Sequence, residues 1–227
     1  MRKQNRLLTA VIVTVSLFTA CKKDDTTTID TTNNGTYKVY TQNSVTYVQN
    51  FVADTIQGYD PMSGQPIGAT GKRVFFSLER SEAVTDTANK TWDLAFNGSK
   101  IWINGGVSGN KMGGAYNVAT LFDNVTNAVD ASMKVDGATR AITGYDPSPN
   151  TASNNGWYTL TPAPPLASVI VTVPGRTILV RTASGKYAKL EIMSYYKGGN
   201  TPSAADPKTE RFYNFRFVYQ ANGSTTF

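Results

Sequence analysis

The chain has 227 residues, with 22 Lys and Arg against 16 Asp and Glu, one cysteine and no histidine. Without histidine there is no Ser-His-Asp triad, Cys-His dyad or histidine metal site, and one thiol closes neither an intrachain disulfide nor a zinc cluster. With 40% hydrophobic and 17% charged residues, the chain is too apolar for a disordered protein and too weakly charged for a coiled coil.

The N-terminus has the pattern of a secretion signal. Three basic residues precede an apolar run, Leu7 to Phe18, and the small residue Ala20 stands before Cys21. The run has about a dozen residues, whereas a membrane-spanning helix needs about 20, so residues 1–20 are predicted to be a cleaved signal peptide. Ala20-Cys21 resembles the lipobox of bacterial lipoproteins, with Phe18 as a departure from it. The resemblance implies a covalent lipid on Cys21; the alternative is an ordinary signal peptide with an incidental cysteine.

The segment after Cys21 is expected to be a tether. Removal of residues 1–20 leaves 19 basic against 16 acidic residues, a net charge of about +3, which argues against nucleic acid as a partner. Lys22-Lys23-Asp24-Asp25 resembles the export signal of surface lipoproteins of the Bacteroidetes, which implies the cell surface rather than the periplasm. Thr26 to Gly35 is polar and of low complexity, so residues 21–36 are predicted to link the lipid flexibly to the domain.

Residues 37–227 are predicted to form a single antiparallel all-β domain, because short runs rich in Val, Thr, Tyr and Phe alternate apolar and polar positions. A loop rich in Gly and Pro, Gln57 to Gly71, interrupts them. The predicted strands are Tyr37–Tyr40, Val45–Val52, Val74–Leu78, Trp92–Phe96, Ile101–Asn104, Val169–Val173, Arg176–Thr182, Tyr187–Tyr196 and Arg211–Gln220.

The period of two also assigns faces. Trp92, Leu94 and Phe96 are expected to share a buried face, with Asp93 on the opposite, polar face. In the last strand the odd positions from Tyr213 to Tyr219 form an aromatic stripe, which is expected in the core. Residues 118–133 are predicted to be either a helix or an irregular segment. The loop residues Asp54, Asp60 and Asp146 lack the spacing of a Ca²⁺ loop and are expected to be solvated.

Two motifs resemble the HmuY family of surface lipoproteins. They are Trp92-Asp93-Leu94-Ala95-Phe96 and Asn104-Gly105-Gly106-Val107-Ser108-Gly109, and the similarity extends over about residues 73–219. The resemblance implies a lipid-anchored, outer-membrane, all-β protein that binds haem from host haemoproteins and passes it to a TonB-dependent receptor. The residues themselves favour a structural role for these motifs, since glycines at 105, 106 and 109 suit a tight turn.

The resemblance also indicates where haem ligands would lie. The best-known member binds the iron through two histidines, and the matching positions here are Thr161-Pro162-Ala163 and the neighbourhood of Met133. A thioether is a competent axial ligand. The candidates are therefore Met133, then Met112 and Met193, with Tyr145 and Tyr158 as oxygen donors, although the residue types by themselves favour a packing or surface role for each.

Two functional hypotheses remain open. The chain is either a haem-binding surface lipoprotein with Met or Tyr ligands, or a family member that has lost haem binding and binds another ligand or a partner protein. No pair of carboxylates can be matched to a glycosidase site from the sequence, and an enzyme is not expected.

Overall fold

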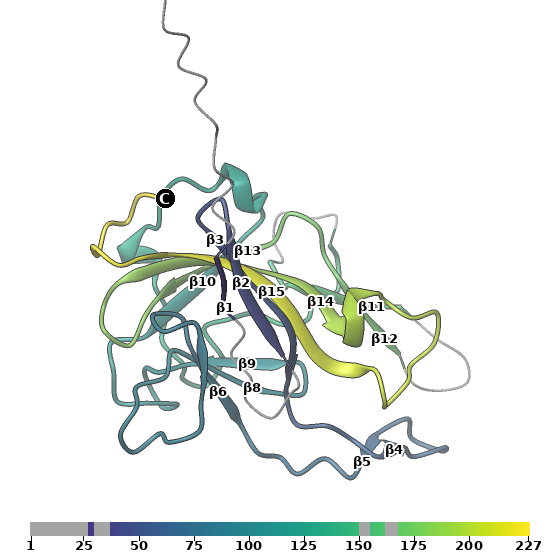
Figure 1. Ribbon diagram of the computed structural model, residues 1–227. Coiled ribbons are helices and arrows are strands. Elements are labelled where there is room, and N and C mark those ends of the chain that lie inside the picture. Colours follow the sequence, from purple (N-terminus) through teal and green to yellow (C-terminus); the bar gives the residue numbers. More distant parts are fainter. Residues whose placement is uncertain (1–26, 30–36, 150–154, 162–167) are drawn as a thin grey trace, which may run out of the picture.

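The computed structural model describes residues 27–29, 37–149, 155–161 and 168–227, which are almost entirely strands and turns (Figure 1). Among these residues no helix is long and apolar enough to span a membrane. The elements are β1 Thr27–Ile29, β2 Lys38–Gln42, β3 Val45–Val52, β4 Gly58–Tyr59, β5 Pro66–Ile67, β6 Val74–Ser77, β7 Glu82–Val84, β8 Leu94–Asn97, β9 Lys100–Ile103, β10 Gly114–Val118, the 3₁₀ turns η1 Phe122–Asn124 and η2 Asp130–Ser132, β11 Tyr158–Thr161, β12 Val169–Thr172, β13 Thr177–Arg181, β14 Tyr187–Tyr196, η3 Lys197–Gly199 and β15 Glu210–Gln220.

A seven-stranded antiparallel sheet is the main layer, in the order β1-β2-β3-β15-β14-β13-β10. The predicted strands between Tyr37 and Val52 and after Val169 are confirmed. The hairpin between β13 and β14 turns at Ser184-Gly185, where Gly185 has φ of 82°, a left-handed conformation that glycine adopts without steric cost. The all-β prediction is therefore correct.

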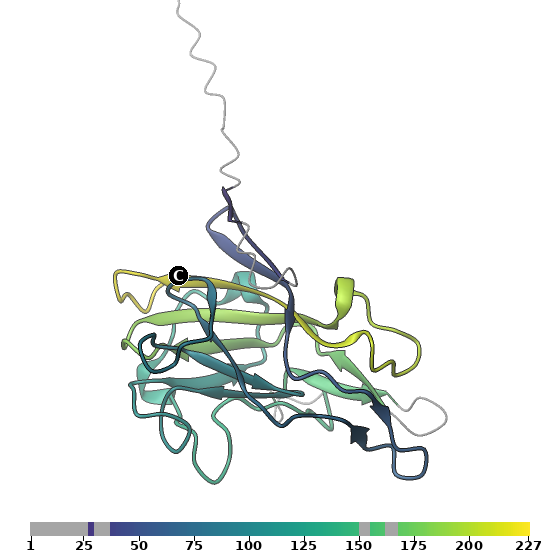
Figure 2. The ribbon, with the colours of Figure 1, turned by 60° about the horizontal axis from the view of Figure 1, so that its bottom comes forward.

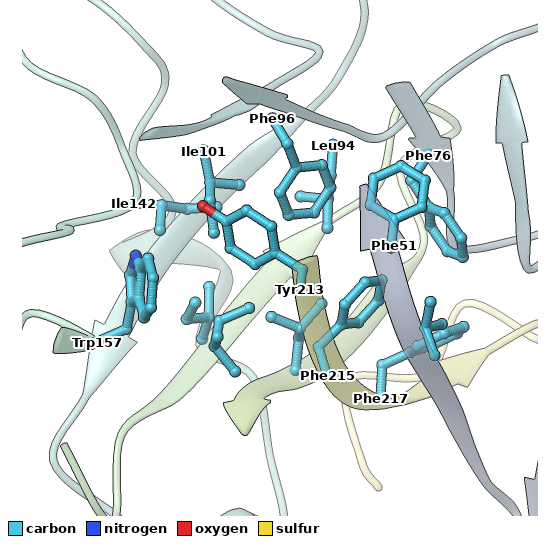
Figure 3. Packing of buried hydrophobic residues seen from close by; sticks show 14 of the residues in the cluster. Phe51, Phe76, Leu94, Phe96, Ile101, Ile142, Trp157, Tyr213, Phe215 and Phe217 are labelled. Atoms are coloured by element: carbon cyan, nitrogen blue, oxygen red, sulfur yellow. The ribbon is translucent and has the colours of Figure 1, made fainter. Parts of the chain in front are cut away.

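A four-stranded antiparallel sheet, β7-β6-β8-β9, forms the second layer, and Figure 2 shows it packed along one face of the larger sheet. Aromatic side chains fill the space between the layers (Figure 3). Phe76 lies 5.3 Å from both Phe51 and Phe215, and Phe96 lies 4.8 Å from Tyr213, measured between ring centroids. The predicted stripe on the last strand is thus part of the core, where aromatic pairs contribute beyond their buried area.

Residues 118–133 form an irregular segment rather than a helix, with η1 and η2 as single turns. They cover the outer face of the large sheet, where Val125 and Ala128 pack against Leu179. Buried Lys189 of β14 holds the segment in place, because its ammonium group donates to the carbonyl oxygens of Phe122 (3.0 Å) and Val125 (2.8 Å). Burial lowers the pKa of Lys189.

The breaker-rich loop, residues 57–71, is anchored at both ends by carboxylates. Asp54 accepts the N–H groups of Thr70 and Gly71, each at 3.0 Å, and the Tyr59 hydroxyl donates to Glu210. The prediction that Asp54 and Asp146 are solvated is wrong: Asp54 is 8% exposed and Asp146 is fully buried, because hydrogen bonds and arginine partners replace their water.

The N-terminal edge of the sheet extends into the segment predicted as a tether. β1 pairs with β2, with Thr27 opposite Thr41 and Ile29 opposite Val39. Three residues of the predicted tether therefore belong to a strand. Cys21 and the signal peptide lie outside the described residues, and the modification of Cys21 remains a prediction.

Candidate functional site

Asp93 joins three segments that are distant in sequence. Its carboxylate accepts the N–H of Leu78 after β6 (2.8 Å) and the N–H of Ala183 in the β13–β14 hairpin (2.9 Å), and the Ser77 hydroxyl lies at 3.4 Å. Asp93 is only 4% exposed, so the prediction that it lies on a polar face is wrong. Burial raises the pKa of Asp93, and the N–H donors oppose that effect.

Trp92 lies on the side of the small sheet that faces away from the main core. It packs against Phe75, with ring centroids 5.0 Å apart, in a cluster with Val84 and Ala95. The expectation that Trp92 shares a face with Leu94 is therefore wrong. β8 begins only at Leu94, and the alternation of faces does not extend to residues before the strand.

The glycines of the second motif fold the loop after β9 tightly onto its neighbours. The Asn104 amide donates to the Trp92 carbonyl (2.9 Å), which links the two motifs. A Cβ on Gly105 would lie 2.1 Å from the Gly113 carbonyl oxygen, and one on Gly109 would lie 2.0 Å from Oδ1 of Asn104. Side chains at these positions would clash, so the motif has a structural role.

Two of the candidate haem ligands, Met112 and Met133, lie next to the same arginine. Nε of Arg181 donates to the Met112 carbonyl at 2.8 Å. A Cβ on Gly114 would lie 3.1 Å from Cβ of Met133 and 3.4 Å from Nη2 of Arg181. Met112 is 59% exposed and its thioether reaches Gly185, whereas Met133 is half-buried. We call Met112, Met133 and Arg181 the methionine corner.

The two candidate tyrosines lie at the other end of the β10–β13 ladder. Gly114 pairs with Arg181 at one end and Val118 with Thr177 at the other, about 13 Å away at ~3.3 Å per residue. Asn117, near the second end, donates from its side-chain amide to the Thr143 carbonyl, and the backbone N–H of Trp157 donates to the same carbonyl. Tyr158 is the next residue after Trp157. The rings of Tyr145 and Tyr158 are 5.9 Å apart, and the Tyr158 hydroxyl is bonded to Ser99 at 3.1 Å. These phenols therefore do not join the methionine corner.

Met193 lies apart from both groups. It is 49% exposed on the outer face of β14, as the sequence predicts, and it lines a hollow of about 200 Å³ together with Tyr47 and Asn214. No other candidate ligand lines this hollow. Met193 is therefore suited as a control rather than as a partner of Met133.

The family model of the HmuY protein matches residues 69–208. The chain belongs to the HmuY family. No curated protein matches it.

Three solved structures are similar to this HmuY-family chain. A candidate lipoprotein from Bacteroides fragilis has 15% identity and a TM-score of 0.45, covering 85% of this chain and 92% of its own. A candidate HmuY-like haem-binding protein from Bacteroides vulgatus has 17% identity and a TM-score of 0.39, covering 73% and 97%. The apo HmuY analogue of Tannerella forsythia has 16% identity and a TM-score of 0.38, covering 87% and 99%.

The other ligand position that the HmuY resemblance indicates is only partly described. Thr161 ends β11 and is exposed, and Pro162 and Ala163 lie outside the described residues. Arg181 was not among the sequence candidates. Its alternation with Val180 predicts only that it points away from the core, and its closeness to both methionines comes from the pairing of β13 with β10.

Proposed function

We propose that this HmuY-family protein is a lipoprotein of the outer membrane surface, anchored through a lipid on Cys21, which binds haem with thioether ligands. It would take haem from host haemoproteins and pass it to a TonB-dependent receptor. Family membership supports the ligand class, and the lipobox-like sequence supports the anchor. The observation that carries the ligand assignment is that Met112 and Met133 both adjoin Arg181.

The donor set of the methionine corner fits haem chemically. Thioethers are soft ligands that bind haem iron, and cationic side chains pair with the haem propionates. Arg181 provides one guanidinium, although Asp130 already accepts a bond from its Nη1 at 2.9 Å. Lys134, next to Met133, is exposed. When bound, haem would supply the iron that is carried, and the protein would hold it without a reaction.

Titration with haemin tests this proposal. The titration uses residues 22–227, which lack the Cys21 thiol, because a free thiol can itself bind iron. We expect a Soret shift at micromolar protein, and at least about tenfold weaker binding for Met112→Ala and Met133→Ala. Met193→Ala is the matched control and is expected to bind as the unchanged chain does. Thermal unfolding of Met133→Ala shows whether its half-buried side chain affects folding instead.

A family member without haem binding is the second candidate function. It is favoured by the absence of histidine from the whole chain. No Soret shift with either ferric or ferrous haem would refute the first function and leave the second. An equal loss in Met193→Ala and Met133→Ala would refute the ligand assignment alone.

A further inference from the structure

A polar groove runs beside the two family motifs, and it is separate from the methionine corner. It consists of two hollows of about 300 and 240 Å³ that share Thr91 and Lys111 as lining residues. Asn104 and Ser108 of the glycine-rich loop line the larger hollow, and Asp93 lines the smaller. We call the two hollows together the Lys111 groove.

The larger hollow of the groove contains an ammonium group without an ion-pair partner. Lys90 and Lys111 line the larger hollow, and no carboxylate does. The Lys90 ammonium lies 3.2 Å from Glu82, whereas Lys111 forms no ion pair or side-chain hydrogen bond with the described residues. A hollow lined by ammonium groups and by no carboxylate attracts an anionic ligand.

The charged groups of the smaller hollow are already engaged. Arg80 is bonded to Glu82 at 2.9 Å and to the Thr91 carbonyl at 2.6 Å. Glu79 lies 3.4 Å from Lys186, and the Asp93 carboxylate accepts backbone N–H groups. Lys111 is therefore the charged group in the groove that is available to a ligand.

The rest of the lining suits hydroxyl groups. The side chains of Ser108 and Asn110 make no hydrogen bond within the described part of the chain, so both are free to bond a ligand. Trp92 lines the larger hollow, but it is only 9% exposed and packs against Phe75, so it offers little aromatic surface to a ligand. The ligand that fits is hydrophilic along its whole length.

One wall of the groove is held in place, and the larger hollow has a suitable size. Asn104 is fixed by its bond to the Trp92 carbonyl, and Gly109 packs directly on the Asn104 side chain. The larger hollow, of about 300 Å³, is at the lower end of the range of small-molecule sites, which suits a ligand of about one ring.

From these observations we infer that the Lys111 groove binds a carboxylated sugar, with the carboxylate at Lys111 and the ring hydroxyls at Ser108, Asn110 and Thr91. One uncompensated ammonium matches a monoanion, whereas a phosphate monoester carries a charge near −2 and commonly recruits arginine. This ligand is independent of haem, since neither methionine lines the groove.

Isothermal titration of the full mature chain with glucuronate, glucose and glucose 6-phosphate tests the inference. We expect millimolar or tighter binding of glucuronate and at least about tenfold weaker binding of glucose. Lys111→Ala should weaken glucuronate binding about tenfold, and Ser108→Ala should weaken it to a smaller extent. The matched control is Lys100→Ala, an exposed lysine at the other end of β9. Met112→Ala should leave the sugar affinity unchanged.

Several outcomes would overturn the inference. These are no binding of glucuronate, equal binding of glucose and glucuronate, tighter binding of glucose 6-phosphate, or an unchanged affinity in Lys111→Ala. An acidic oligosaccharide such as trigalacturonate distinguishes the source of the ligand. If trigalacturonate binds more tightly than glucuronate and loses this affinity in Lys111→Ala, the ligand is the end of a glycan. If the two bind equally, the ligand is a free acidic monosaccharide.

Discussion

Replacement of Asp93 by alanine is the sharpest test of how the family motif works. The carboxylate is the acceptor for two backbone N–H groups, those of Leu78 and Ala183, which lie 15 and 90 residues away in sequence. Alanine would leave both donors buried without an acceptor. The small sheet and the β13–β14 hairpin would then lose their shared attachment point.

The size of the loss follows from these contacts. Hydrogen bonds to a charged acceptor contribute about 1.5–3 kcal/mol each, and the two bonds are short, at 2.8 and 2.9 Å. Burial of the charge offsets part of this gain, as the raised pKa of Asp93 indicates. We therefore expect Asp93→Ala to lower the free energy of unfolding by about 3 kcal/mol. For a domain of this size that corresponds to a fall in Tm of about 6–12 °C.

Urea and thermal unfolding followed by tryptophan fluorescence measure this loss. Asp93→Asn keeps one acceptor oxygen and should lie between the unchanged chain and Asp93→Ala. The control is Asp123→Ala, because the Asp123 side chain is 74% exposed and its one ion pair, to Arg216, is 3.5 Å long; such pairs contribute little. If Asp93→Ala unfolds within about 1 kcal/mol of the unchanged chain, the carboxylate does not hold these segments together and the reasoning fails.

Two further predictions concern the glycine loop and the anchored loop. Gly106 has φ of 63° and a Cβ there would lie 2.0 Å from the Asp136 carbonyl oxygen, so Gly106→Ala should cost at least about 2 kcal/mol in urea unfolding. Gly137→Ala, where an added Cβ meets no atom within 4 Å, should stay within about 0.5 kcal/mol, and equal losses would contradict the steric argument. Burial acts to raise the pKa of Asp54, but hydrogen bonds from Thr70 and Gly71 outweigh it and lower the pKa below 3.8. This carboxylate thus stabilises the fold above pH 3.8, and its contribution is lost as the pH falls through the lowered pKa. Asp54→Asn should lower the free energy of unfolding by about 1–3 kcal/mol at pH 7 and by less in acid. A loss that does not change with pH would exclude this linkage.

The long strands were predictable because their own side chains determine which face is buried. In β14 the residues Ala188, Leu190 and Ile192 are buried in the core and Met193 is exposed, as alternation requires. β7 and β10 were missed for a different reason. β7 has three residues, and β10 begins at Gly114 and contains Asn117; pairing with β6 and β13, rather than local pattern, makes them strands.

The candidate site was less predictable, because its contacts join residues that no local pattern connects. Alternation predicted Asp93 on a polar face, yet the N–H of Ala183, in a hairpin 90 residues later in the chain, donates to its carboxylate and helps to bury it. In the same way, the sequence identifies Met112 and Met133 as separate candidates, and only the pairing of β10 with β13 sets Arg181 beside both.

The two motifs hold a frame, while side chains that take no part in it lie next to them. The side-chain amide of Asn104 donates to the Trp92 carbonyl, and the backbone carbonyl of Asn104 accepts the N–H of Gly113. The backbone N–H of Met112 donates to the Ala183 carbonyl. These contacts fix both ends of residues 105–112 without using the side chains of Ser108, Lys111 or Met112. A substitution of any of these three side chains should therefore leave the frame intact, so its effect on haem or sugar binding can be measured without a change of fold.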